Sequence, residues 1–155
     1  MHNCALSDKT GSVDLLVTND PGSSYTSSNN YALDLYSDEL SAGMDVTNQS
    51  STVIKNVVNV PVQRLEDLHF DGPISYLKID VQGEEAQILK GLGKSHRPAV
   101  IRVEVSSVMK ENNISTLTQV LMWAEQNSYS LLGASYEDNK KYDFASEFDI
   151  AIQGD

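Results

Sequence analysis

The alternation of apolar and polar residues is clearest in the second half of the chain, where it predicts a strand, a helix and another strand. Tyr76–Val81 is apolar except for Lys78 and Asp80, which is typical of a parallel strand buried on both faces. Glu84 and Glu85 then favour the positive end of a helix dipole, so a helix is predicted to begin there. The glycines at positions 91 and 93 end this helix.

The next strand is predicted over Ala99–Val105, where every second residue is apolar and faces the core. A strand, a helix and a strand over residues 76–105 predict two parallel neighbours joined by a right-handed crossover. A second helix is predicted over Ser115–Gln126, with Ser115 or Thr116 as its cap. Its apolar stripe is spaced for a single helix face and consists of Leu117, Val120, Leu121 and Ala124.

Two further strands are predicted near the C-terminus, over Ser130–Tyr136 and Phe148–Gln153. The simplest arrangement for them is an antiparallel pair at the edge of the sheet. The predicted fold class is therefore α/β, with a mostly parallel sheet and an antiparallel C-terminal edge pair. A chain of 155 residues fits one domain, so residues 1–155 are predicted to form a single unit.

The N-terminal half is less regular. Val13–Val17 and Val53–Val62 predict strands, and Arg64–Leu68 predicts a single helical turn. Thr18–Ser51, between the strands, is rich in Ser, Asn, Gly and Asp, and a loop of this length is usually mobile or forms a lid over a substrate.

Composition excludes some partners. The formal net charge is -11, because 22 acidic residues face 11 Lys and Arg. Such a surface repels polyanions, so neither nucleic acid nor an anionic membrane is predicted as a partner. Cys4 is the only cysteine, so no internal disulfide can form, and a reducing cytoplasm is the predicted location. No apolar run approaches the roughly 18 residues of a membrane helix, and no secretory signal is visible at the start.

The strongest candidate for chemistry is Asp80, which ends a predicted parallel strand just before a helix begins. Ligands of open α/β sheets bind beyond the carboxyl ends of the strands. Glu104 lies near the same end of the next strand, so both carboxylates are predicted to face one crevice. The alternative is structural: Asp80 caps the helix, and Glu104 pairs with Lys78 or Arg102. Glu85, in the first helical turn, is at least as well explained by the helix dipole as by a ligand.

Other motifs carry less chemistry. The segment Gly91–Ser95 (GLGKS) suggests a phosphate loop, but the motif needs glycine where Ile88 stands, and it follows a helix instead of preceding one. The histidines at positions 2, 69 and 96 share no ligand spacing, so none is predicted to be catalytic. A Mg²⁺ or Ca²⁺ site formed by Asp80, Glu85 and Glu104 is chemically allowed, but no ligand spacing specifies it, and no metal is predicted.

Five short motifs occur in a fixed order along the chain. They are ALSDKTG at Ala5–Gly11, VPVQRLEDL at Val60–Leu68, LKIDVQGEE at Leu77–Glu85, LKG at Leu89–Gly91 and VEV at Val103–Val105. Together the motifs, over roughly residues 3 to 106, resemble the FkbM-type methyltransferase domain, which shows ALSDxxG, VPVxxLDxL, KIDVEGxE, LKG and a strand ending in VE. The resemblance implies a Rossmann-like fold that uses S-adenosylmethionine to methylate a hydroxyl, often of a sugar or secondary metabolite.

The resemblance also implies roles for individual residues. Ala5 and Leu6 would end the third strand of the fold near the adenine of the donor. Asp80 would lie near the methionine part of the donor and the acceptor, where it would act as the catalytic residue with Glu104 in support. Glu85 matches the last acid of KIDVEGxE and is implied in cofactor binding.

The sequence departs from the family pattern in two respects. Gln82 replaces a glutamate, and no G-x-G occurs upstream of Asp80, where such methyltransferases hold the donor with a glycine-rich turn. We therefore expect a domain that lacks the N-terminal donor-binding strands, and a non-catalytic binding module on the same scaffold is the alternative. Without a first strand, Tyr76–Val81 has an unpaired edge, which predicts either a homodimer through this edge or cover by residues 53–62.

Overall fold

The computed structural model describes residues 3–18, 25–26, 54–81, 83–106, 110–111, 114–138 and 146–154. Two compact units make up the chain. The N-terminal unit comprises Met1–Ala5 and Gly11–Val62, and the C-terminal unit comprises Leu6–Thr10 and Gln63–Asp155. Residue Gln82 and most of Thr18–Ser51, for which a mobile loop or lid was predicted, lie outside the described residues.

The N-terminal unit is built on a long antiparallel strand pair. Strand β2 (Gly11–Thr18) runs against β4 (Ile54–Gln63), which confirms the two strands predicted in this half. The sheet has the order β1-β4-β2-β3, in which β1 (Ala5–Leu6) and β3 (Tyr25–Thr26) are two residues each. Leu16 and Val62 supply its buried side chains among the described residues.

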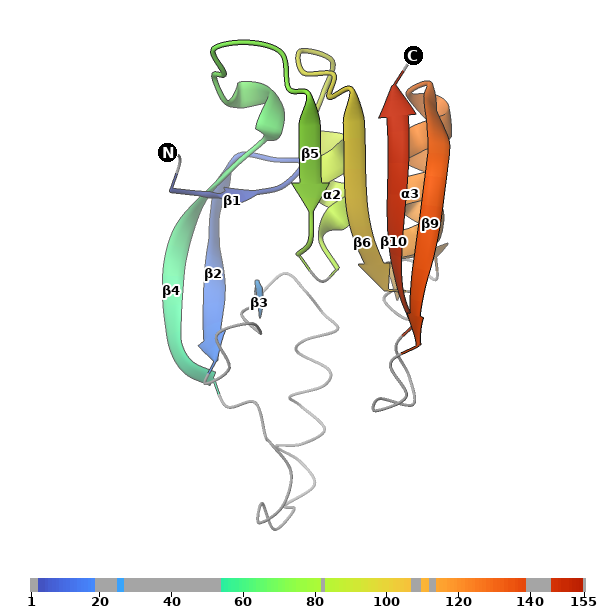
Figure 1. Cartoon of the computed structure of the whole chain (residues 1–155). Coiled ribbons are helices and arrows are strands. Elements are labelled where there is room, and N and C mark those ends of the chain that lie inside the picture. Colours follow the sequence, from blue (N-terminus) through green and yellow to red (C-terminus); the bar gives the residue numbers. More distant parts are fainter. Residues whose placement is uncertain are drawn as a thin grey trace. The chain divides into compact units, whose positions relative to one another are not determined.

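The C-terminal unit contains a four-stranded mixed sheet (Figure 1). Its order is β5-β6-β10-β9, formed by β5 (Tyr76–Ile79), β6 (Val100–Ser106), β10 (Ser146–Gly154) and β9 (Tyr129–Asp138). Only β5 and β6 are parallel, whereas β10 is antiparallel to both β6 and β9. The predicted antiparallel C-terminal pair is confirmed. A mostly parallel sheet is wrong, because β10 returns between β6 and β9 and reverses two of the three pairings. A separate two-stranded pair consists of β7 (Lys110–Glu111) and β8 (Ile114–Ser115).

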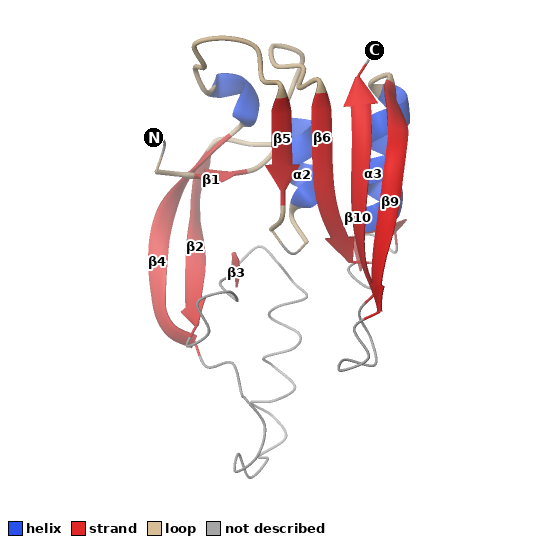
Figure 2. Cartoon of the chain, viewed as in Figure 1, coloured by secondary structure: helices blue, strands red, loops and turns tan. Residues whose placement is uncertain are grey.

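Both α-helices of this unit cover the same face of the sheet (Figure 2). They are α2 (Glu85–Gly91) and α3 (Thr116–Gln126), and both pack against β6 and against each other. The 3₁₀ turn η1 (Leu65–Asp67) confirms the single helical turn predicted there. The core between sheet and helices consists of apolar side chains, among them Leu89, Leu92, Ile101, Val103, Val105, Val120, Ile150 and Ile152.

Strand β5 is buried on one face only, which corrects the prediction of two buried faces. Ile79 is 3% exposed, whereas Tyr76, on the opposite face of the strand, is 54% exposed. The reason is that both described helices pack on the Ile79 face. The opposite face of the sheet, which carries Lys78 and Arg102, is open to solvent within the described residues.

The second helix starts where the sequence predicts. The Ser115 hydroxyl accepts a hydrogen bond from the Thr118 backbone N–H (3.2 Å) and caps the first turn. Val120 and Ala124 of the predicted stripe are buried, but Leu121 is 40% exposed. The buried face is therefore rotated slightly away from Leu121, because α3 packs on both α2 and the sheet.

Strand β5 forms one edge of its sheet among the strands that the structure describes. Strand β4 hydrogen-bonds to β1 and β2 and so has a partner on each side. Cover of the β5 edge by residues 53–62 stays a prediction. Association of two copies through this edge stays a prediction.

Candidate functional site

The candidate site lies at the carboxyl end of the parallel strand pair formed by β5 and β6. Strand β5 ends at Ile79, which is paired with Val103 of β6, and Asp80 follows directly. Side chains alternate along a strand, so Asp80 and Glu104 lie on the same sheet face, which is the face opposite the helices. The tertiary structure thus brings the two predicted carboxylates to one end of two neighbouring strands.

Lys78 holds Asp80 in place, whereas the sequence had indicated Lys78 only as a partner of Glu104. Lys78 Nζ donates a hydrogen bond to Asp80 Oδ2 at 2.6 Å. This hydrogen bond raises the pKa of Lys78, and the charges of Asp80 and Glu104 add to the effect, so the ammonium stays protonated. The two-residue spacing of Lys78 and Asp80 on a strand was the available signal, because it places both side chains on one face.

A second ion pair extends the charged face across the sheet. The guanidinium of Arg102, paired in register with Lys78, donates to both carboxylate oxygens of Asp149 at 3.0 and 2.6 Å. The Arg102 guanidinium lowers the pKa of Asp149, first by hydrogen bonding and then by its charge. Asp149 therefore competes with Glu104 for Arg102, because it binds the guanidinium through both carboxylate oxygens.

Glu85 faces inward. Its side chain is 1% exposed, and its Oε1 and Oε2 accept the Gly83 backbone N–H at 2.8 and 3.0 Å. Burial raises the pKa of Glu85, although backbone hydrogen bonds from Gly83, Val81 and Glu85 itself act in the opposite direction. The carboxylate implied in cofactor binding is thus engaged by the turn that leads from Asp80 into α2.

The other implied cofactor residues, Ala5 and Leu6, form the half-buried strand β1. The chain after Leu6 packs at the opposite end of α2 from Glu85, because the Ser7 carbonyl lies against Gly91. The chain just after Leu6 therefore lies beside the end of α2. Their role toward a donor stays a prediction.

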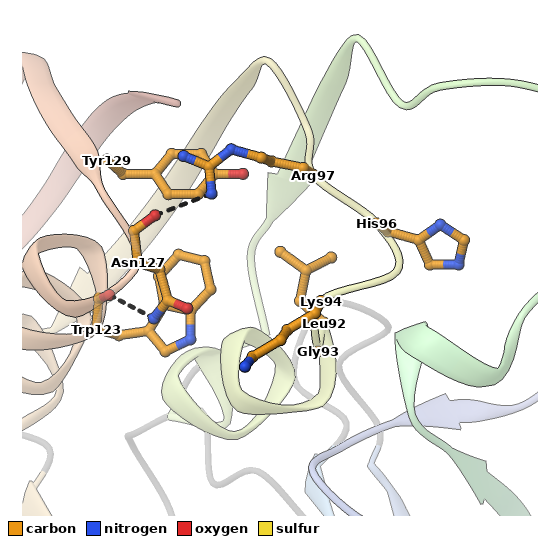
Figure 3. A pocket seen from close by; sticks show the side chains of 8 residues that line it. All are labelled: Leu92, Gly93, Lys94, His96, Arg97, Trp123, Asn127 and Tyr129. Atoms are coloured by element: carbon orange, nitrogen blue, oxygen red, sulfur yellow. Dashed lines mark hydrogen bonds between the residues drawn. The ribbon is translucent and has the colours of Figure 1, made fainter. Parts of the chain in front are cut away.

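A small hollow of about 100 Å³ lies at the opposite end of the same helix–sheet layer (Figure 3). Arg97 crosses it, with its guanidinium 5.0 Å from the centre of the Tyr129 ring. The same guanidinium donates to the backbone oxygens of Asn127 and Ser128 at 3.0 and 3.1 Å, where α3 ends. Tyr129 in turn donates to the Pro98 carbonyl at 2.9 Å. These bonds tie the loop before β6 to the turn between α3 and β9, so the hollow is best explained as part of the packing.

Two other kinds of site find no support in the described part of the chain. No three His, Cys, Asp or Glu side chains there lie close enough together to hold a metal ion. His96 is half-buried and bonds through Nε2 to the Leu68 carbonyl (2.9 Å), with its ring edge-on to Phe70. His69 is exposed, and His2 lies outside the described residues. None of the helices described is long and apolar enough to cross a membrane.

The family model for the methyltransferase FkbM domain matches residues 1–131 of this chain. The chain belongs to the FkbM methyltransferase domain family. A search of curated proteins found no match. Membership confirms the resemblance drawn from the five motifs and assigns the domain to the methyltransferases.

The FkbM motifs acquire physical roles in this structure. The lysine and aspartate of LKIDVQGEE form the ion pair at the end of β5, and its last glutamate, Glu85, holds the following turn. The glycine of LKG, Gly91, leaves room for the backbone of the ALSD segment. The VEV strand provides two fully buried valines and carries Glu104 between them on the charged face. Four separate motifs of the FkbM domain thus meet around α2.

Proposed function

We propose that this FkbM domain forms the acceptor side of an S-adenosylmethionine-dependent O-methyltransferase with a Rossmann-like fold. The acceptor is a hydroxyl of a sugar or secondary metabolite. The observation that carries the proposal is the Asp80 carboxylate at the end of the parallel pair. Lys78 occupies its Oδ2, and within the described part of the chain Oδ1 has no hydrogen-bond partner.

In this proposal Asp80 orients the acceptor. Its Oδ1 accepts the hydrogen bond of the acceptor hydroxyl and takes the hydroxyl proton as a general base. Lys78 fixes the carboxylate through Oδ2, so the free oxygen points in one direction. Glu104, on the same face of the next strand, adds negative charge beside the hydroxyl. Holding the two reactants in line supplies most of the acceleration.

The residues present fit the acceptor more fully than the donor. S-adenosylmethionine would supply the methyl group from a positively charged sulfur, and the exposed Asp80 suits that charge. Its amino acid and ribose parts need a backbone cradle and a hydroxyl acceptor. No G-x-G precedes Asp80 in the sequence, and Glu85 is already engaged by the backbone. The described residues therefore do not provide a full donor site, and no step is assigned to the donor here.

The proposal includes partners. A small hydroxylated molecule or a carbohydrate is the acceptor, and the net charge of -11 argues against nucleic acid and anionic membranes. A second copy pairing along β5 is proposed for the open sheet edge, and the cytoplasm as the location, since one cysteine needs no oxidising compartment.

A non-catalytic binding module on the same scaffold is the second candidate. One observation favours it: the Lys78 ammonium competes with any hydroxyl for Asp80, which suits a structural ion pair as well as a catalytic one. A module of this kind would bind a ligand at the charged sheet face without transferring a methyl group.

Calorimetry with S-adenosylmethionine and S-adenosylhomocysteine distinguishes the candidates. The enzyme proposal expects binding by this chain or by a version extended upstream, and a loss of methyl transfer in Asp80→Asn. Asp71→Asn is the matched control, because its carboxylate is fully exposed and takes no part in the site. No heat with either length of chain would remove the enzyme proposal and leave the binding module.

A further inference from the structure

Glu85 is the one buried charged side chain among the described residues. It is 1% exposed, and the other buried polar residue, Thr116, carries no charge. Burying an ionised carboxylate costs free energy unless hydrogen bonds compensate for the lost water. The buried Glu85 carboxylate, in the first turn of the seven-residue helix α2, therefore needs hydrogen-bond donors from the surrounding chain, which a surface acid would not need.

The compensation comes from the turn that links β5 to α2. Gly83 donates its N–H to both carboxylate oxygens of Glu85, at 2.8 and 3.0 Å. The backbone of Val81 also stabilises the charged form, as does the backbone of Glu85 itself. Because Val81 is the residue after Asp80, the carboxylate anchors the chain within one residue of the candidate catalytic group.

The backbone of this turn needs such an anchor. Gly83 has a φ of 117°, a backbone conformation that residues other than glycine rarely adopt. A glycine is also the most flexible residue when it is not held. The Glu85 carboxylate removes that freedom, because both of its oxygens hold the same N–H in place.

We propose that Glu85 is a positioning residue that locks the backbone of Val81 and Gly83 and thereby sets the direction of the Asp80 carboxylate. This assigns Glu85 a role different from the donor contact that the family resemblance implies. The inference rests on the proposed function in one respect, namely that Asp80 receives the acceptor hydroxyl. The lock itself is a property of the folded chain and can be measured without any ligand.

The test follows the backbone amides of wild type and Glu85→Gln by NMR over pH. In the wild type, the Gly83 amide shift should titrate with the Glu85 carboxylate, and in Glu85→Gln this titration should vanish. Amide exchange at Val81 and Gly83 should accelerate about tenfold, because a hydrogen bond to a charged group is lost. The Asp80 carboxyl resonance should shift as well, a change that a purely local cap would not produce.

Glu84→Gln is the matched control, since it removes the neighbouring acid and should leave the Gly83 titration in place. A Gly83 amide that does not titrate, or an Asp80 resonance unchanged in Glu85→Gln, would overturn the proposal. Calorimetry separates this from the proposed function. If the Gly83 amide titrates as expected but neither length of chain binds the donor, the enzyme proposal alone fails. If the donor binds but the Gly83 amide does not titrate, the proposed role of Glu85 alone fails.

Discussion

Gly91, the last residue of α2, packs directly against the backbone carbonyl of Ser7. A β-carbon at position 91 would overlap the Ser7 oxygen and would lie 2.9 Å from its carbonyl carbon. Ser7 is itself held in place, because its N–H donates to the Gln63 carbonyl at 3.1 Å. Two family motifs, LKG and ALSD, are therefore linked by a contact that only glycine permits.

The first prediction concerns this contact. Gly91→Ala is expected to lower the free energy of unfolding by about 2 kcal/mol, because backbone atoms cannot yield as a flexible side chain does. The overlap should outweigh the roughly 1 kcal/mol that alanine gains over glycine in a helix. Urea denaturation followed by circular dichroism measures the change.

Gly72→Ala is the control for this experiment. A β-carbon at position 72 meets nothing within 4 Å, and the backbone there is not in the left-handed region. Its effect should stay within about 0.5 kcal/mol. Equal effects of the two substitutions would show that the Ser7 contact is not tight.

The second prediction is the pH dependence of stability due to Glu85. Burial raises the pKa of Glu85 in the folded state, so the native protein binds more protons than the unfolded chain between the two pKa values. Stability from this group is fully present below the unfolded pKa and falls as the pH rises through the folded pKa. Glu85→Gln cannot titrate, so its stability relative to wild type should improve as pH rises from about 4 toward neutrality.

Glu125→Gln provides the comparison for that measurement, because it makes the same chemical change at an exposed position on α3. Unfolding curves of wild type, Glu85→Gln and Glu125→Gln at several pH values make the comparison. A difference between wild type and Glu85→Gln that is constant with pH, or that runs the other way, would contradict the raised pKa.

The third prediction concerns the ion pair between Arg102 and Asp149. A double-mutant cycle with Arg102→Met and Asp149→Asn should give a small favourable coupling energy at neutral pH, typical of a solvent-exposed pair. The pKa of Asp149 is lowered in the folded state, so this stabilisation is present above the unfolded pKa and lost as pH falls through the folded value. A coupling energy that is unchanged at pH 2 would contradict the assignment.

The fourth prediction concerns the end of α3. Ser128 has φ of 58°, in the left-handed region that favours glycine, and it follows the C-cap Asn127. Ser128→Gly should raise the free energy of unfolding by roughly 0.5–1 kcal/mol, because it removes the strain of a β-carbon in that conformation. Ser130→Gly is the control, since an exposed strand residue should lose stability on the same change. A loss of stability in Ser128→Gly would show that the backbone there is not strained.

The local structure could be predicted from the sequence because each element carries its own period. Alternation along residues 100–105 specifies which side of β6 is buried, and the structure confirms it at Ile101, Val103 and Val105. Ser115 predicts the start of α3, because a hydroxyl before an apolar stripe accepts a hydrogen bond from a free N–H group of the first turn. The ordered motifs were enough to identify the family, since each contributes independently.

Strand order and side-chain burial depended on contacts distant in sequence. Placing β10 between β6 and β9 is a choice among pairings with similar local patterns, so a mostly parallel sheet was predicted and a mixed one formed. The open face of β5 likewise depends on where the helices pack.

The same distinction holds for the end of β5 where the candidate site lies. Local apolar patterning and the position of Gly83 already specify that Asp80 follows a strand and precedes a helix. The hydrogen bond from Lys78 to Asp80 and the inward position of Glu85 beside Gly83 become visible in the folded chain alone. Those contacts depend on how the chain folds back at Gly83. The free energies of burial and hydrogen bonding that stabilise this turn come from many neighbours, which a short stretch of sequence does not contain.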